Sequence, residues 1–279
     1  MRLAFKTAPQ HTTWSDMLEV WRAADEIEAF ESGWTFDHFY PIVGNTDGPC
    51  LEGWVTLAAL AQATRRLRLG VLVTGIHYRH PAVLANMAAT IDIISAGRLE
   101  LGIGAGWNEQ ESGAYGIALG SPAERSNRLE EACQVLIGLL STERTTLTGR
   151  FFTLRDARCE PKGPQRPHPP ICIGGSGERR TLRTAARYAQ HWNFVGGTVE
   201  EFGRKVEVLR HHCQELGRDP AELTISSHIR LGRDGDPGPA VQTAAAMAEL
   251  GLDLAIVPLP TPHRAAQLEP IARAFAELA

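Results

Sequence analysis

The sequence predicts a fold of the α/β class, a single (β/α)₈ barrel of the TIM type. Eight short β-type runs alternate with helix-period segments from one end of the 279-residue chain to the other. One insertion, at about residues 141–169, interrupts this alternation between the fourth helix and the fifth strand. A doubly wound open sheet shows the same alternation, and the count of eight favours the closed barrel.

The expected strands are short apolar runs, each followed by a helical pattern. They are Leu3–Thr7, Gly33–Asp37, Leu67–Thr74, Leu99–Gly104, Pro170–Gly174, Trp192–Val195, Leu223–Leu231 and Leu254–Pro258.

Several of the expected helices carry end signals in the sequence. Ser121–Glu124 is a capping box with proline at the first helical position, where the missing N–H costs nothing. Thr198–Glu201 is a second capping box, and Gly217 stands where a glycine ends that helix. Pro81 opens another helix, which Gly97 ends.

The insertion predicts a small hairpin, with strands at 145–147 and 151–154, followed by the proline-rich run 161–170. A boundary between two domains is the competing interpretation. It is less favoured because neither half has enough strands to close a barrel alone. We therefore expect one domain over residues 1–279.

The composition excludes several classes of protein. A net charge of −4 offers no basic face for nucleic acid or anionic lipid, and no apolar run is long enough for a membrane span or a signal peptide. The cysteines are scattered without a C-x-x-C pair, which argues against a disulfide framework or a zinc site. They are Cys50, Cys133, Cys159, Cys172 and Cys213. A reducing cytoplasm is the expected location.

In a (β/α)₈ barrel the active site forms at the C-terminal ends of the strands. Gly174–Gly177 follows the fifth expected strand and precedes a helix, so its backbone N–H groups and the helix N-terminus favour a phosphate site. Arg179, Arg180 and Arg183 follow and add positive charge. In the alternative interpretation the glycines only form a tight turn and the arginines are a solvated face.

A second glycine-rich run, Gly102–Trp107, has glycine at alternate positions at the end of the fourth strand. Small residues there make room for a flat group against the strand. Trp107 then stacks on that group or closes one side of the cleft; alternatively it caps the barrel core.

Asp37 and His38 form the best acid–base pair at a strand end, because histidine titrates near neutral pH and an adjacent carboxylate tunes it. His11, His77 and His80 are rival candidates. The sequence lacks the H-E-x-x-H and G-x-S-x-G motifs of metalloproteases and serine hydrolases. The residues alone thus indicate a barrel enzyme with an anionic, partly flat ligand and a histidine, and they leave the reaction open.

Five segments in this order resemble one known family: 36–39, 69–75, 78–82, 95–107 and 171–177. The chain resembles the luciferase-like monooxygenase superfamily, and most closely its branch that depends on the deazaflavin coenzyme F420. The resemblance covers about residues 1–215.

The resemblance implies a homodimeric (β/α)₈ barrel that binds F420, or alternatively FMN, with the ring over the strand ends. It places Asp37 and His38 beside the reactive face, with His38 as the acid–base or substrate-orienting residue. It also implies a bulged third strand at Val71–Gly75, often with a non-proline cis peptide behind the ring. The implied cofactor-binding residues are Asp37, Val73, Thr74, Gly104, Ala105, Gly106, Trp107, Gly174, Gly175, Ser176 and Gly177.

The chain departs from the family pattern at one position. Some F420-dependent dehydrogenases have an acidic glutamate directly after the G-x-G-x-G run, where this chain has Trp107, with Glu109 two residues later. The leading hypothesis is hydride transfer between F420 and a small organic substrate. The alternatives are an FMN-dependent monooxygenase and a flavin-binding barrel without catalysis. Segments Trp54–Ala61 and Val83–Ile94 look apolar on more than one face, which also favours a homodimer.

Overall fold

The structure is a computed structural model that describes residues 1–278. Its parallel strands close into an eight-position barrel, because β1 pairs with both β2 and β11, and β3 pairs with β5. The fold prediction is therefore confirmed. The barrel strands are β1 (Arg2–Lys6), β2 (Phe30–Thr35), β3 (Arg68–Val71), β4 (Thr74–Gly75), β5 (Leu99–Gly104), β8 (Ile171–Gly174), β9 (His191–Phe194), β10 (Thr224–His228) and β11 (Leu254–Pro258).

The third strand position differs from the continuous run that the apolar pattern predicts. It is divided into β3 and β4, and the peptide bond between Leu72 and Val73 that separates them is cis. The non-proline cis peptide implied by the resemblance is thus present. The seventh strand also ends earlier than expected, since β10 leaves its ladder with β11 after His228 pairs with Ile256.

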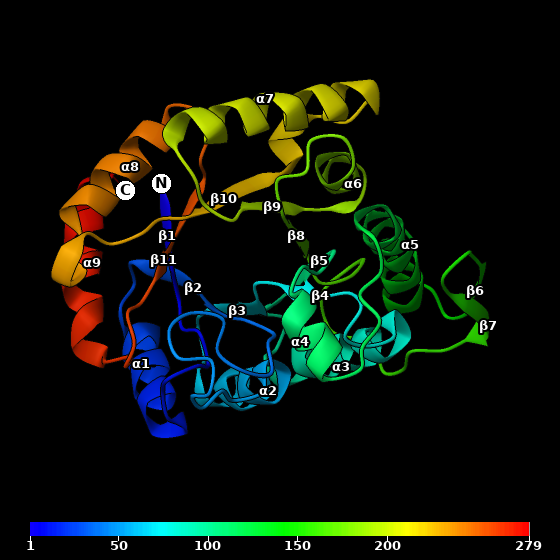
Figure 1. Ribbon diagram of the computed structural model, residues 1–279, viewed down its shortest axis with the longest axis horizontal. Helices are drawn as coiled ribbons and strands as arrows, with labels where there is room; N and C mark the ends of the chain where they lie inside the picture. Colours follow the sequence, from blue (N-terminus) through cyan, green and yellow to red (C-terminus); the bar gives the residue numbers. More distant parts are fainter. Residues whose placement is uncertain (279) are drawn as a thin grey trace.

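The helices surround the strands as a ring (Figure 1). They are α1 (Trp14–Glu26), α2 (Gly53–Ala63), α3 (Pro81–Ile94), α4 (Glu109–Ala114), α5 (Pro122–Ser141), α6 (Thr181–Tyr188), α7 (Val199–Glu215), α8 (Gly238–Ala248) and α9 (Leu268–Phe275). None of the helices in residues 1–278 is both long enough and apolar enough to cross a membrane.

The helix ends follow the sequence signals. Both expected capping boxes form, at Ser121 and Thr198, and Pro81 is the first residue of α3. Gly97 and Gly217 have φ of +88° and +67°, the left-handed conformation in which glycine ends a helix. The short helix α4 was not expected, and it places a buried glutamate in the site described below.

The insertion between α5 and β8 contains the expected hairpin, formed by β6 (Thr145–Thr148) and β7 (Thr153–Ala157). Figure 1 shows this hairpin beyond the ring of helices, next to α5. The Glu131 carboxylate of α5 accepts the backbone N–H groups of Arg150, Phe151 and Phe152, which fixes the turn. Phe152 and Leu154 pack into the same apolar core as the barrel helices.

A chain of buried polar groups crosses the inside of the barrel. Arg68 donates to the Glu100 carboxylate (2.8 Å), which also contacts Nδ1 of His191 (2.9 Å). Nε2 of His191 lies 2.6 Å from the hydroxyl of Ser226, and the amide of Asn193 donates to the same hydroxyl (2.9 Å). This network ties the barrel interior to Asn193, which lines the cavity at the barrel mouth.

Candidate active site

A cavity of about 340 Å³ opens at the C-terminal ends of the barrel strands. This position and size are typical of small-molecule sites in barrel enzymes. Eight of the expected site residues line it: His38, Val73, Gly104, Ala105, Gly106, Trp107, Gly174 and Gly175. Four do not: Asp37, Thr74, Ser176 and Gly177.

His38 follows β2 and is almost fully buried beside the cavity. Its Nδ1 lies 2.7 Å from Oε2 of Glu111, a buried residue of α4. The hydroxyl of Tyr78 donates to the same carboxylate oxygen, and the backbone N–H of Phe39 donates to Oε1 (2.6 Å). In residues 1–278 no protein group forms a hydrogen bond with Nε2 of His38, so this nitrogen is available to a ligand.

The charge on Glu111 fixes the tautomer of His38. Burial alone would raise the pKa of Glu111, but the hydrogen bonds from His38, Tyr78 and the Phe39 amide outweigh burial and lower it. An ionised carboxylate only accepts hydrogen bonds, so neutral His38 carries its proton on Nδ1. Its Nε2 lone pair then faces the cavity as a proton acceptor.

Asp37 does not pair with His38, and the interpretation of these neighbours as an acid–base couple is wrong. The Asp37 carboxylate is fully buried and is held by both terminal nitrogens of Arg79, one of them at 3.1 Å. Successive residues of an extended chain point to opposite sides. The carboxylate partner of His38 is therefore Glu111, far along the sequence.

The three rival histidines have structural contacts outside the cavity. Nδ1 of His80 accepts the N–H of Ala82 and caps α3. Nε2 of His11 lies 3.1 Å from the carbonyl oxygen of Val43, and Nε2 of His77 lies 3.0 Å from the hydroxyl of Ser112. None of the three lines the cavity, so His38 is the one of the four candidate histidines that does.

The alternate glycines of β5 make room for the chain itself rather than for a ligand. A Cβ at Gly104 would lie 2.8 Å from the Val73 side chain, and a Cβ at Gly174 would lie 2.9 Å from it. A Cβ at Gly102 would collide with the carbonyl oxygen of Val71. Gly102, Gly104 and Gly174 therefore accommodate the bulged third strand, and Gly104 and Gly174 line the cavity beside Val73. Thr74 points away from the cavity and accepts a hydrogen bond from Trp54 (2.7 Å).

The loop after β8 has two free backbone donors. Gly175, with φ of +125°, uses its N–H on the carbonyl of Asn193 (3.3 Å). In the described chain no hydrogen bond occupies the N–H of Ser176 or Gly177, and both residues line an adjoining open depression of about 620 Å³. Helix α6 starts only at Thr181, later than expected, because residues 178–180 form a turn. The loop amides themselves, more than the helix N-terminus, are suited to an anion.

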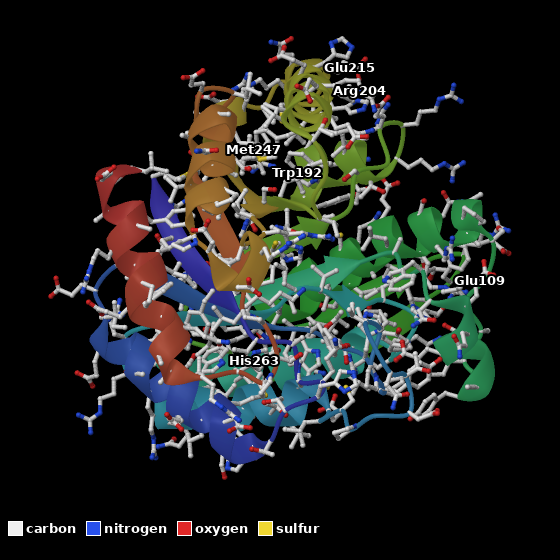
Figure 2. All side chains as sticks on the ribbon, turned by 60° about the vertical axis from the view of Figure 1, so that its left-hand side comes forward. Glu109, Trp192, Arg204, Glu215, Met247 and His263 are labelled. Atoms are coloured by element: carbon white, nitrogen blue, oxygen red, sulfur yellow. The ribbon has the colours of Figure 1, made fainter. Side chains whose placement is uncertain are left out.

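Trp107 lies at the mouth of the cavity with 60% of its surface exposed. Its ring lies 5.7 Å from that of His38, with the two planes strongly inclined. Because the side chain is exposed, the alternative that it caps the barrel core is excluded. Glu109, by contrast, is exposed at the start of α4 and lies at the edge of the molecule, outside the cavity (Figure 2).

The sequence analysis assigned no role in the site to several of its polar residues, among them Lys6, Tyr78, Glu111 and His228. One signal was present for Glu111. Asn108 is the N-cap of α4 and accepts the N–H of Glu111 (3.0 Å), so the spacing N-x-x-E marks a helix start with a carboxylate in its first turn.

Comparison with known proteins connects this geometry to a family. The family model described as luciferase-like monooxygenase matches residues 2–274. The chain belongs to the luciferase-like monooxygenase family. It is an enzyme of this oxidoreductase type, as the resemblance implied.

Similar proteins include several F420-dependent enzymes. The chain is 29% identical to an F420-dependent glucose-6-phosphate dehydrogenase of Kineococcus radiotolerans, over 90% of this chain and 74% of that protein. It is 31% identical to an F420-dependent hydroxymycolic acid dehydrogenase of Mycobacterium tuberculosis, over 75% of this chain and 57% of that protein. A solved F420-dependent secondary alcohol dehydrogenase, in complex with an F420–acetone adduct, superposes with a TM-score of 0.88 over 100% of both chains, at 18% identity. The last likeness concerns the fold.

Proposed function

We propose that this luciferase-like enzyme uses F420 and transfers a hydride between the deazaflavin and a small organic substrate. The observation that carries the proposal is the His38–Glu111 pair, which presents a free Nε2 to the cavity at the strand ends. Two relatives named as F420-dependent dehydrogenases support the choice of cofactor.

The residues of the cavity fit a tricyclic ring with one polar edge. Phe36, Ile42, Leu72 and Val73 give the cavity an apolar side, and polar side chains from β1, β9 and β10 give it another. The free N–H groups of the loop after β8 suit the phosphate of the side chain. When bound, F420 supplies a ring carbon that takes up or gives a hydride, which is two-electron chemistry.

The protein contributes positioning and proton transfer. Neutral His38 accepts a proton from the substrate through Nε2, and its conjugate acid returns one in the reverse direction. The carboxylate of Glu111 stabilises the imidazolium that forms, and Tyr78 holds that carboxylate in place. Trp107 covers the mouth of the cavity, so a bound substrate is shielded from water.

An FMN-dependent monooxygenase is the second candidate. The chain is 33% identical to the pyrimidine monooxygenase RutA of Methylobacterium radiotolerans, over 67% of this chain and 53% of that protein. The absorbance spectrum of the purified protein, after incubation with each cofactor and removal of the excess, tests both. Retained F420 supports the proposal, and retention of FMN alone supports the monooxygenase.

We further propose that two copies of the chain associate through α2 and α3. Large apolar side chains stay exposed on these neighbouring helices, namely Val55 (73%), Val83 (54%), Ile93 (43%) and Ile94 (39%). Exposed apolar side chains on two neighbouring helices are suited to burial in a protein–protein interface.

A further inference from the structure

Lys6 stands on the wall of the cavity that faces the loop after β8. It is the last residue of β1. Around the barrel, β8 is four positions from β1 in either direction, through β2, β3 and β5 or through β11, β10 and β9. A ligand whose phosphate binds the β8 loop and whose ring fills the cavity therefore extends toward Lys6.

Within residues 1–278, the ammonium group of Lys6 has hydrogen-bond acceptors for two of its three protons. Its Nζ donates to the carbonyl oxygen of Leu72 (3.1 Å) and lies 3.5 Å from Nε2 of His228. Nδ1 of His228 contacts the carbonyl of Val195 (3.1 Å), so it carries the ring proton and Nε2 accepts. In residues 1–278 no carboxylate forms an ion pair with Lys6. The remaining N–H bond is available to a ligand.

Lys6 and His228 are half-buried neighbours on the cavity wall. Burial lowers the pKa of Lys6 to about 8, and burial together with the nearby ammonium lowers the pKa of His228 well below its usual value. Lys6 is thus mostly charged at neutral pH, and its histidine neighbour is neutral. A half-buried ammonium group without an anionic partner favours an anionic ligand group in the cavity that it lines.

Asn193, at the end of β9 next to β8, adds a second polar side chain to the cavity. Nδ2 of Asn193 donates to the hydroxyl of Ser226 (2.9 Å), which also contacts Nε2 of His191 (2.6 Å). In the described chain no hydrogen bond occupies Oδ1 of Asn193, so this oxygen is available to a ligand.

We propose that Lys6 binds the anionic edge of the reduced cofactor ring, the N1–C2=O edge of its pyrimidine-dione, and thereby favours the reduced form over the oxidised one. The ammonium group of Lys6 can donate to the carbonyl of that edge, and Asn193 offers the cavity a further polar side chain. Hydride uptake adds two electrons and one proton to the ring, so the ring gains one negative charge, which N1 and the C2 oxygen share. A cation near this edge stabilises the added charge.

The inference rests on the proposed function only in requiring that such a ring binds here. F420 and FMN both carry the dione edge, so the role of Lys6 does not depend on which of them is used.

The test compares the dissociation constants of oxidised and reduced cofactor, measured by anaerobic absorbance and fluorescence titration. We expect Lys6→Gln to weaken binding of reduced F420 by about 10- to 100-fold, the range of one charge-assisted hydrogen bond. Binding of oxidised F420 should change much less, and Lys6→Arg should keep most of the preference. Lys162→Gln is the matched control, because Lys162 contacts Cys159 and Glu160 outside the cavity.

Equal weakening of both forms in Lys6→Gln, or no change in either, would overturn the role of Lys6. A change in the substrate KM with both cofactor constants intact would also overturn it and assign Lys6 to the substrate. Lys6→Met replaces Lys6→Gln if the latter does not fold, as judged by its melting temperature. Failure of the wild type to bind either F420 or FMN would instead contradict the proposed function, and the role of Lys6 with it.

Discussion

His38 uses its two ring nitrogens for different tasks. Nδ1 is committed to Glu111, and Nε2 faces the cavity. Replacement of His38 by alanine should lower kcat by roughly 10²- to 10⁴-fold, the usual contribution of general acid–base catalysis. Cofactor affinity should persist, because the phosphate loop lies on another part of the cavity wall.

Steady-state kinetics, cofactor titration and melting temperature on the His38→Ala variant separate three outcomes. A lower melting temperature with unchanged turnover per folded molecule would make His38 a packing residue. A change confined to KM would mean that the reaction needs no proton transfer. Glu111→Gln should reproduce much of the loss in kcat, since a neutral amide no longer stabilises the imidazolium, and Glu109→Gln is its exposed control.

The loop after β8 provides a second test at single residues. Valine at Gly175 should weaken cofactor binding at least about tenfold, because φ of +125° is strained for a β-branched residue and Cβ would lie 3.2 Å from Thr181. Gly217→Val is the control, with a similar left-handed strain far from the cavity. If the two variants had equal dissociation constants for the cofactor by fluorescence titration, the loop would not be part of the binding site.

Only some of the individual residues of this site could be predicted from the sequence. The position of His38 follows from the rule that strand ends carry the site. The carboxylate partner of His38 could not be predicted in this way. Asp37 is the neighbour of His38 in sequence, but it pairs with Arg79, and only the fold brings Glu111 to His38. Lys6 reads as an ordinary strand residue until β10 places His228 beside it.

At the scale of elements, the buried network through Glu100 links β3, β5, β9 and β10. Burial would raise the pKa of Glu100, but His191 and Arg68 outweigh burial and lower it from 4.5 to about 2. Because the pKa of Glu100 is lower in the folded state than in the unfolded state, its ionised carboxylate stabilises the fold above pH 4.5. This stabilisation is lost as the pH falls toward 2.

Glu100→Gln should therefore reduce the free energy of unfolding at pH 7 by roughly 3 kcal/mol, and the difference from wild type should shrink near pH 3. Denaturant unfolding at both pH values measures it, with Glu109→Gln as the exposed control. A difference that stays constant between pH 7 and pH 3 would show that the ionisation of Glu100 does not stabilise the fold.

Helix starts were predictable because a capping box is a local signal, and both boxes at Ser121 and Thr198 form as expected. The break in the third strand was not predictable from periodicity, since residues 69–74 are uniformly compatible with one strand. Only the family resemblance pointed to the cis peptide between Leu72 and Val73. Gly104 of β5 and Gly174 of β8 both accommodate this bulge and line the cavity, so their role as cofactor contacts stays a prediction.

At the scale of the whole molecule, the count of eight strand–helix units predicted a closed barrel. The structure confirms this closure, because β1 pairs with β11 and β3 pairs with β5. Association with a second copy is a separate expectation. The protein should be a dimer at micromolar concentration by light scattering, and Val55→Glu with Ile94→Glu should produce a folded monomer. A monomeric wild type would refute the dimer.

We propose that the cavity at the barrel mouth binds F420 as the hydride-carrying cofactor. The most direct measurement is an anaerobic titration of the purified protein with F420 and with FMN in parallel, followed by absorbance and fluorescence. We expect F420 to bind with a micromolar or lower dissociation constant and FMN to bind more weakly. The Gly175→Val variant should bind F420 more weakly than the Gly217→Val control does. Tight binding of FMN together with no binding of F420 would contradict the account.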